Sequence, residues 1–256
     1  AEKIVLSVED YNVTFDREIM EHVSFVLHAG DKVAIVGPNG TGKTTLLRDV
    51  IKGENPAIRL GENVKMAYLS QMHGEVFDEK ATVLKNFEDA GFDTDDQVIA
   101  YLKTYGFEEE LIYSSVCDLS GGEKNLLQLA KISRTGAGLL LLDEPTSHLD
   151  TYSQLALEQA VEKYNGTVLM VSHDFYTVAN CMDYVLLTED KGLRRVSMRK
   201  FRKMIYADHF DKDYLEYEQK KKELENRIAF ALQAGKYEDA KKILEELEKL
   251  LQKYNG

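Results

Sequence analysis

The sequence contains no tryptophan, only three prolines, and only two cysteines among its 256 residues. Glycine and proline together are scarce, which excludes a collagenous or low-complexity chain. The cysteines, Cys117 and Cys181, lie far apart and form no CxxC pair, so the spacing excludes a disulfide scaffold and suits a reducing cytosol. The strongest apolar run, residues 139–142, is far shorter than the ~18 residues of a membrane helix, and no basic-then-apolar signal peptide opens the chain. We therefore expect a cytoplasmic globular protein.

Acidic residues outnumber basic ones by 44 to 32, which gives a formal net charge of −12. Such a surface disfavours non-specific nucleic-acid binding by the molecule as a whole. The charge is unevenly spread, because residues 191–203 (KGLRRVSMRKFRK) contain seven Lys or Arg and no acid. We expect this segment to form a local basic patch. It is either a solvated edge or, together with the lysines at 220–222, a contact surface for RNA phosphates.

Short apolar runs alternate with helical patterns over most of the chain. The first 30 residues read as an antiparallel β-element. A strand at KVAIVG ends in a glycine-rich turn and is followed by a helix, and further strands are predicted at VKMAYLSQ, GLLLLDE, TVLMVSH and YVLLTE. Helices are predicted at 121–134, 151–163 and 174–181, and residues 81–116 read mostly as helix, with turns at Gly91 and Gly106. This alternation predicts an α/β fold with a parallel sheet.

The chain after residue 200 has a different character, since 22 of its last 49 residues are charged. Apolar residues recur there at heptad-like spacing in two runs on either side of Gly235. We predict two amphipathic helices folded into an antiparallel hairpin. The expected organisation is therefore an α/β domain over residues 1–200 and a charged C-terminal helical extension over residues 201–256, although the tail could instead be a linker between two domains.

Residues 37–44 read GPNGTGKT, which satisfies the pattern G-x-x-x-x-G-K-[ST]. Small glycines let consecutive backbone N–H groups surround a phosphate chain, and the helix that follows adds its positive dipole end. Lys43 is placed to contact the β- and γ-phosphates, and the Thr44 hydroxyl to bind Mg²⁺. An ordinary glycine turn before a helix is the structural alternative, which the apolar strand in front of the motif disfavours.

Residues 139–144 read LLLLDE, a buried strand that ends in two carboxylates. Asp143 is placed to hold Mg²⁺ through water, and Glu144 to accept a proton from an attacking water. Taken alone this motif is weak, because a strand can also end in two solvated acids.

The segment LSGGE at residues 119–123 gives the pattern its specificity. Together with GPNGTGKTT and LLLLDEPTSHLD, it resembles the ATP-binding-cassette ATPases in order and spacing over residues 1 to about 200. The resemblance implies the fold of a P-loop NTPase of this type, with an antiparallel β subdomain and a helical subdomain beside the α/β core. It also implies ATP and Mg²⁺ as substrate and cofactor. In this family LSGGE closes over ATP bound to a second ATPase domain.

The resemblance assigns roles to individual positions of this sequence. Catalysis falls to Gln71, Glu144 and His173. The nucleotide-binding residues are Phe15, Gly37, Asn39, Gly40, Thr41, Gly42, Lys43, Thr44 and Thr45. Mg²⁺ is assigned to Thr44, Gln71 and Asp143, and contact with the partner's site to Ser120, Gly121, Gly122 and Asp150. Tyr11 competes with Phe15 for the aromatic that stacks on adenine. Leu126 departs from the family pattern, which usually has Arg there.

Within that family the chain is most similar to the ABC-F proteins. The loop after DEPTS reads His148-Leu149-Asp150, the interval from Lys43 to Gln71 is short, and GENVKMAYLSQ also resembles ABC-F sequences. The resemblance implies the C-terminal half of a two-domain protein that acts on the ribosome, with no membrane domain. The implied partners are a second ATP-binding-cassette domain, either an upstream half or a second copy, and the ribosome or its RNA. The alternatives are the ATPase subunit of a membrane transporter and a nucleotide-binding switch with negligible turnover in isolation.

Overall fold

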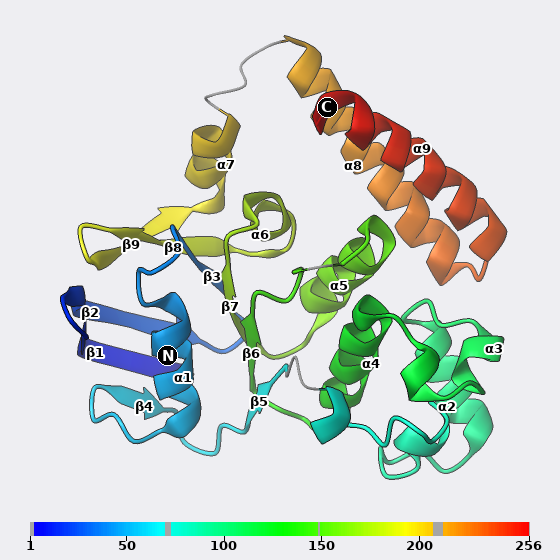
Figure 1. The fold of residues 1–256 in the computed structure, drawn as a ribbon, viewed down its shortest axis with the longest axis horizontal. Helices are drawn as coiled ribbons and strands as arrows, with labels where there is room; N and C mark the ends of the chain where they lie inside the picture. Colours follow the sequence, from blue (N-terminus) through cyan, green and yellow to red (C-terminus); the bar gives the residue numbers. More distant parts are fainter. Residues whose placement is uncertain (1–2, 70–72, 148, 207–211, 256) are drawn as a thin grey trace.

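The computed structural model describes residues 3–69, 73–147, 149–206 and 212–255. A six-stranded sheet forms the centre of the molecule, in the order β5-β6-β7-β3-β8-β9 (Figure 1). Its strands are β3 (Lys32–Val36), β5 (Met66–Tyr68), β6 (Leu139–Asp143), β7 (Thr167–Ser172), β8 (Tyr184–Glu189) and β9 (Gly192–Ser197). The first five run parallel, and β9 pairs antiparallel with β8. The α/β class predicted from the sequence is thus confirmed.

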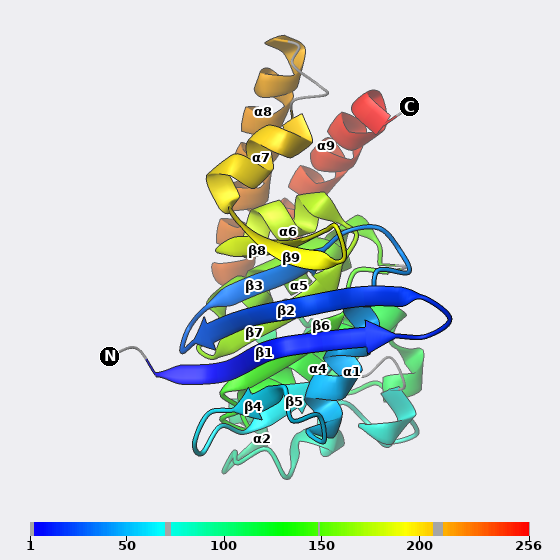
Figure 2. The same cartoon turned by 90° about the vertical axis from the view of Figure 1, so that its left-hand side faces the viewer.

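A second, three-stranded sheet covers one face of the first. It has the order β2-β1-β4, with β1 (Ile4–Thr14), β2 (Glu18–His28) and β4 (Ile58–Leu60), all antiparallel (Figure 2). The antiparallel element expected in the first 30 residues is therefore present, as the pair β1 and β2. The pairing is irregular where Asp10 and His22 have positive φ angles of 52° and 51°. Strand β4 was not predicted, because three residues are too few to show an alternating pattern.

Side chains of the parallel strands alternate between two cores, as the period of two residues requires. Val33, Ile35 and Leu141 face the cluster beneath the small sheet, where α1 (Lys43–Lys52) packs. Ala34 and Leu142 face the opposite cluster. The helices that cover this second face are α4 (Gly121–Ser133), α5 (Thr151–Lys163), α6 (Phe175–Cys181) and α7 (Met198–Tyr206). Helices α1 and α4 therefore lie on opposite faces of the parallel sheet.

Residues 73–118 form a small helical unit beside α4. Its elements are η1 (His73–Glu75), η2 (Lys85–Phe87), α2 (Asp95–Lys103), α3 (Glu109–Ile112) and η3 (Val116–Asp118). They surround a core that contains Phe87, Leu102 and Leu127. The turns predicted at Gly91 and Gly106 are present, but the prediction that residues 81–116 are mostly helix was wrong, since less than half of them are helical. Gly91 and Gly106, with φ angles of 77° and 89°, interrupt the chain with left-handed turns.

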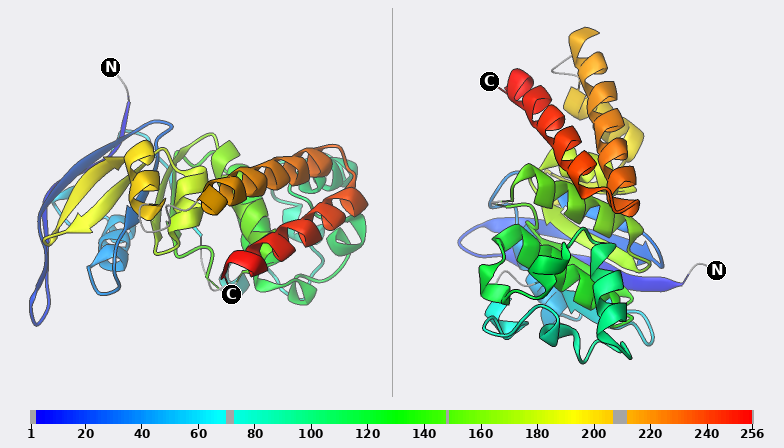
Figure 3. Two further views of the ribbon diagram at one scale, coloured as in Figure 1. Left: turned by 90° about the horizontal axis from the view of Figure 1, so that it is seen from above. Right: turned by 90° about the vertical axis from the view of Figure 1, so that its right-hand side faces the viewer.

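The C-terminal hairpin is present as predicted. Helices α8 (Lys212–Gln233) and α9 (Tyr237–Asn255) run antiparallel, and Gly235 turns the chain with a φ of 68° (Figure 3). Leu224, Ile228 and Leu247 of the hairpin are buried against Leu155 of α5. The expected boundary at residue 200 falls inside α7. Among the described residues, no helix combines the length and the apolar character that a membrane span requires.

The basic segment 191–203 folds into β9 and α7, and the sequence predicted neither element. Several of its bases bind within the chain. Arg194 pairs with Glu189, Lys191 with Glu21, and the Arg195 guanidinium lies 3.8 Å from the centre of the Tyr184 ring. Arg202 donates two hydrogen bonds to the carbonyl of Ala179. Arg199, Lys200 and Lys203 of α7 are exposed as well.

Candidate functional site

The glycine-rich loop connects β3 to α1 at the carboxyl end of the central strand. Gly40 and Gly42 have φ angles of 77° and 85°, which glycine adopts without strain. Gly37 is required for a different reason, because a Cβ atom there would lie 1.7 Å from Oγ1 of Thr188 on β8. The neighbouring strand thus fixes the start of the loop, and the left-handed glycines wrap its backbone into a turn that leads to the N-terminus of α1.

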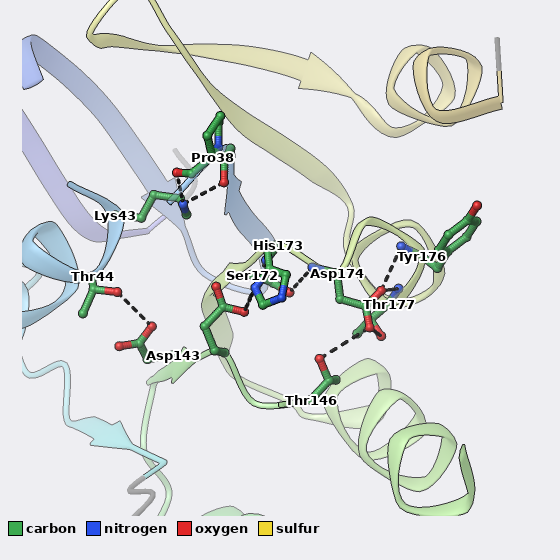
Figure 4. Close-up of polar contacts among 12 residues, drawn as sticks. Pro38, Lys43, Thr44, Asp143, Thr146, Ser172, His173, Asp174, Tyr176 and Thr177 are labelled. Atoms are coloured by element: carbon green, nitrogen blue, oxygen red, sulfur yellow. Dashed lines mark hydrogen bonds and ion pairs between the residues drawn. The ribbon is translucent and has the colours of Figure 1, made fainter. Parts of the chain in front are cut away.

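Lys43 lies inside this turn and is almost fully buried. Its Nζ atom donates hydrogen bonds of 2.7 Å to the carbonyls of both Gly37 and Pro38 (Figure 4). Burial lowers the pKa of Lys43, while the negative charges of Glu144 and Asp143 act in the opposite direction. An ammonium group held by loop carbonyls at a helix N-terminus is a strong attractor for a polyanion such as a phosphate chain.

Asp143 ends β6 and lies beside the start of α1. The Thr44 hydroxyl donates a hydrogen bond of 3.3 Å to its Oδ1 atom. Burial raises the pKa of Asp143, the hydrogen bond from Thr44 lowers it, and the charge of Glu144 raises it. The pair offers hard oxygen donors, which suit Mg²⁺. In the part of the chain that the structure describes, no three His, Cys, Asp or Glu side chains converge on one point.

Glu144 follows Asp143 and has a φ of 47°, a strained backbone conformation for a residue with a side chain. Its N–H donates to the Val171 carbonyl at 2.8 Å, which holds the turn against β7. Its Oε2 atom lies 2.8 Å from Nδ1 of His173 and accepts a hydrogen bond of 3.3 Å from the His173 backbone N–H. The strained turn therefore aims the carboxylate at the loop after β7, within electrostatic reach of Lys43.

The two aromatic candidates for base stacking have opposite environments. Tyr11 is fully buried, and its hydroxyl donates a hydrogen bond of 2.7 Å to Asp49. Its ring is therefore a core side chain with no free face. Phe15 is 65% exposed in the turn after β1. The adjoining residues Arg17 and Ile19 line a cleft of about 330 Å³ together with Pro38, Gly40 and Thr41 of the loop. Phe15 is thus the candidate whose ring can receive a base near the loop.

The residues assigned to a partner's site lie together at the starts of α4 and α5. Ser120 caps α4 in a capping box with Glu123, in which the hydroxyl accepts from the Glu123 N–H at 3.2 Å. Asp150 caps α5 by accepting from the Ser153 N–H at 2.7 Å. Gly122 packs against α5, whereas no atom lies within 4 Å of a Cβ atom placed at Gly121.

Asn39 and Thr45 lie in the loop and in the first turn of α1, beside the other predicted nucleotide-binding residues. Gln71, predicted as a catalytic and Mg²⁺-binding residue, lies outside the described residues. A larger cavity of about 1100 Å³ lies between the ends of α2, α4 and α5 and the hairpin, and none of the predicted site residues lines it.

The sequence did not predict the polar cluster behind His173, in which the buried Glu158 and Thr177 bond to the half-buried Gln154 and the exposed Asn180. Their only signal was polarity at inward positions of α5 and α6, which is too weak to identify a cluster. The roles of Pro38 and Thr188 were also missed, because they depend on a backbone carbonyl and on a neighbouring strand.

Comparison with known proteins matches the chain to one protein family. A family model described as "ABC transporter" matches residues 20–147. ABC transporter F family member 5 of Arabidopsis thaliana is 38% identical over 192 residues, which cover 73% of this chain and 28% of that protein. The energy-dependent translational throttle protein EttA of Escherichia coli strain K12 is 33% identical over 228 residues, which cover 85% of this chain and 38% of that protein. The chain thus spans well under half the length of these relatives.

Solved structures show the same fold. A dimeric ATP-binding cassette in a post-hydrolysis state, bound to ADP and Pi, superposes with a TM-score of 0.60 at 20% identity. The match covers 76% of this chain and 99% of that chain. At this identity the likeness establishes the fold alone, including the subdomains predicted from the sequence.

Proposed function

Because this chain belongs to the ATP-binding-cassette ATPases and its relatives include ABC-F proteins, we propose that it binds Mg-ATP at the loop of residues 37–45 and hydrolyses it with Glu144 as general base. The observation that carries the proposal is the strained Glu144, which follows Asp143 in the chain and pairs with His173. Figure 4 shows Asp143 with its hydrogen bond from Thr44, and His173 near them. Hydrolysis needs a base, a metal-ligating carboxylate and a phosphate-binding cation at one place, and these residues supply all three.

Phosphate binding falls to Lys43 and the backbone N–H groups around it. The Lys43 ammonium now donates to two loop carbonyls, and it can exchange these for phosphate oxygens without leaving the loop. Thr44 and Asp143, with Gln71, are the side chains that would hold Mg²⁺. The bound ion supplies charge neutralisation at the β- and γ-phosphates.

Proton transfer falls to Glu144. Its carboxylate is 21% exposed, so it can meet a water molecule, while one of its oxygens is anchored by the backbone and ring nitrogens of His173. The other oxygen remains to orient the water for in-line attack and to accept its proton. His173 is more exposed, at 61%, and in this proposal it donates a hydrogen bond to the γ-phosphate.

A second ATPase domain completes the site in this proposal. Helix α4 lies on the face of the sheet opposite α1, so the LSGGE segment belongs to a different part of the surface from the Lys43 loop. The open space at Gly121 leaves the N-terminus of α4 accessible to an anion from another domain. We propose that the other domain is an upstream half of the same protein or a second copy of this chain.

The test of ATPase chemistry is phosphate release from Mg-ATP by the purified chain, alone and with added EDTA. We expect turnover that needs the divalent ion, and nucleotide binding measurable by calorimetry even where turnover is slow. Absence of ATP binding by the folded protein would remove the proposal.

We further propose that the ATPase serves a ribosome-associated protein. One relative carries the name energy-dependent translational throttle protein, and Arg199, Lys200 and Lys203 remain exposed on α7 for phosphate contacts. Substitution of these three residues by Glu is expected to reduce the amount of protein that co-sediments with ribosomes. It should also make the binding less sensitive to salt concentration. The matched control reverses the exposed bases Lys65, Lys80 and Lys85. Equal co-sedimentation of both triple variants and the parent would leave α7 as a solvated edge.

A further inference from the structure

A buried cluster of polar side chains lies between α5 and α6, directly behind the loop that carries His173. Glu158 of α5 and Thr177 of α6 are only 7% and 1% exposed. Gln154 of α5 and Asn180 of α6 donate hydrogen bonds to Glu158, of 3.4 and 3.2 Å. Burying a carboxyl group is costly unless it is neutral or well paired. The proposed hydrolysis step uses none of these side chains, so their burial calls for another explanation.

Asp174 connects the cluster to the catalytic residues. It follows His173 in the chain and caps α6, because its Oδ1 atom accepts from the backbone N–H groups of Tyr176 and Thr177 at 3.1 Å each (Figure 4). Its own N–H donates to the Ser172 hydroxyl at 3.0 Å. The position of Asp174 therefore fixes the peptide of His173, whose N–H donates to Glu144.

The Thr177 hydroxyl lies between two carboxyl groups. Its Oγ1 atom is 2.8 Å from Oε1 of Glu158 and 3.0 Å from Oδ2 of Asp174. Gln154 Nε2 also approaches this oxygen, at 2.8 Å, and Oδ2 of Asp174, at 3.2 Å. A hydroxyl has one hydrogen, so it can donate to only one of the two carboxyl groups.

The protonation of Glu158 decides which of these contacts is a hydrogen bond. A neutral Glu158 can donate its own proton to Thr177, which then donates to Asp174, so that both short contacts are satisfied. An ionised Glu158 competes with Asp174 for the single Thr177 hydrogen. One oxygen–oxygen contact is then left to depend on Gln154 alone.

The surroundings of Glu158 favour the neutral form. Burial raises the pKa of Glu158 to about 7, and the charge of Glu225 on α8 raises it too, against hydrogen bonds from Thr177 and Asn180 and the charge of Lys221 on α8. Besides these groups, the buried thiol of Cys181 on α6 lies within electrostatic reach of Glu158, and Asp174, which caps α6, contacts the same Thr177 hydroxyl. Helix α8 supplies both of the charged groups on the hairpin side, so the hairpin forms part of this environment.

We propose that Glu158 is a positioning residue: through Thr177 and Asp174, its buried carboxyl group holds the loop that carries His173. Its role in turnover rests on the proposed function, but the positioning itself does not. Breaking the cluster moves His173 away from Glu144 and leaves the phosphate-binding loop unchanged. The signature is therefore slower hydrolysis at unchanged ATP affinity.

The experiment compares four variants of the full chain. Glu158→Leu and Thr177→Val remove the contacts at similar volume, Thr177→Ser restores the hydroxyl, and Glu162→Leu changes an exposed carboxylate one turn further along α5. The first readout is the imidazole NMR signal of His173, assigned with His173→Gln, and it needs no ATP. We expect the signal to shift in Glu158→Leu and Thr177→Val only. The second readout is kcat, expected to fall about 10- to 100-fold in those two at unchanged ATP dissociation constant.

A fifth variant, Glu158→Gln, keeps a permanently neutral group. We expect it to keep both the His173 signal and kcat near those of the parent, and to remove the part of the pH–rate profile that belongs to Glu158. An unmoved His173 signal in Glu158→Leu and Thr177→Val, whatever their melting temperatures, would overturn the inference. A parent chain that fails to hydrolyse ATP would overturn the proposed function instead, and the NMR comparison would still decide the role of Glu158.

Discussion

Gly122 at the start of α4 packs directly against Ser153 at the start of α5: a Cβ atom added at Gly122 would lie 2.4 Å from both the Cβ and Oγ atoms of Ser153. The neighbouring Gly121 has open space at the same position. The two adjacent glycines are therefore required at their positions for different physical reasons. Gly122 permits the contact between helices, and Gly121 leaves the helix end open.

This difference predicts opposite effects of two alanine substitutions. Gly122→Ala must push α4 away from α5 and is expected to lower the free energy of unfolding by about 1–3 kcal/mol. Gly121→Ala, in the first helical turn, is expected to be neutral or to stabilise by up to about 1 kcal/mol. Urea unfolding of the two variants measures both values, and equal stabilities would contradict the packing argument.

Lys43→Ala is expected to abolish measurable ATP binding, because it removes the ammonium at the centre of the loop. The fold should persist, since the loop glycines and α1 remain. Lys52→Ala, in the last turn of the same helix, is the matched control, and its ATP affinity should equal that of the parent. Calorimetric titration with Mg-ATP makes the comparison. Equal affinity of Lys43→Ala and Lys52→Ala would refute the assignment of the phosphate site.

Substitutions at Phe15 and at Tyr11 should have separate effects, on ATP affinity and on the free energy of unfolding respectively. Stacking of a base on an aromatic ring contributes roughly 1–3 kcal/mol, so Phe15→Ala should weaken ATP binding by up to about a hundredfold. Its unfolding free energy should hardly change, because the ring is mostly exposed. Tyr11→Phe loses the hydrogen bond to Asp49 and should lower stability by about 1 kcal/mol at unchanged ATP affinity. Equal ATP affinity of Phe15→Ala and the parent would refute the stacking role of Phe15.

Glu158 should make stability depend on pH in a predictable direction. Its pKa is raised from 4.5 to about 7 in the folded protein, first by burial and then by Glu225. Between these values the unfolded chain releases a proton that the folded chain keeps, so this contribution is fully present below pH 4.5 and is lost as the pH rises towards 7. The loss is at most about 3 kcal/mol.

Glu158→Gln removes that dependence. The stability of Glu158→Gln relative to the parent should therefore rise between about pH 5 and about pH 8. Glu162→Gln, which changes an exposed side chain of the same helix, should show a constant difference. Urea unfolding over this pH range provides the test, and parallel profiles for the parent and Glu158→Gln would show that Glu158 is not buried as a neutral acid.

The sequence predicted best those elements whose residues are buried on both sides or repeat regularly. Strands β6 and β7 are continuous apolar runs, and the hairpin repeats its apolar residues at heptad-like spacing. Strand β9 escaped prediction because it is an edge strand with Arg194 and Arg195 in its middle and only Val196 buried. Edge strands tolerate charge, so their composition resembles that of a loop.

Site residues could be predicted from the sequence where they belong to one short motif. Lys43, Thr44, Asp143 and Glu144 belong to two such motifs, and the structure brings them together. The choice between Tyr11 and Phe15 needed the structure, because the irregular pairing around Asp10 obscures which side chains of β1 face the core. The Glu158 cluster joins two helices, and its partners Gln154 and Thr177 are 23 residues apart in the sequence. No local sequence pattern could therefore predict it.

The proposed mechanism depends above all on Glu144. Replacement by Gln keeps the size of the side chain and removes its basicity, and a general base typically contributes about 10²–10⁴ in rate. It also removes a negative charge beside the phosphates, so ATP should bind at least as well. Because this ATP is not hydrolysed, two copies of the chain should form a dimer in which the LSGGE segment of each copy contacts the ATP bound to the other.

The most direct measurement is multiple-turnover phosphate release by Glu144→Gln with Mg-ATP, combined with light scattering in Mg-ATP and in Mg-ADP. We expect turnover to be lost, ATP affinity to be retained, and a dimer to form in Mg-ATP only. A monomer in both nucleotides would identify an upstream domain, rather than a second copy, as the partner. Hydrolysis at the rate of the parent chain would contradict the assignment of Glu144 as the general base.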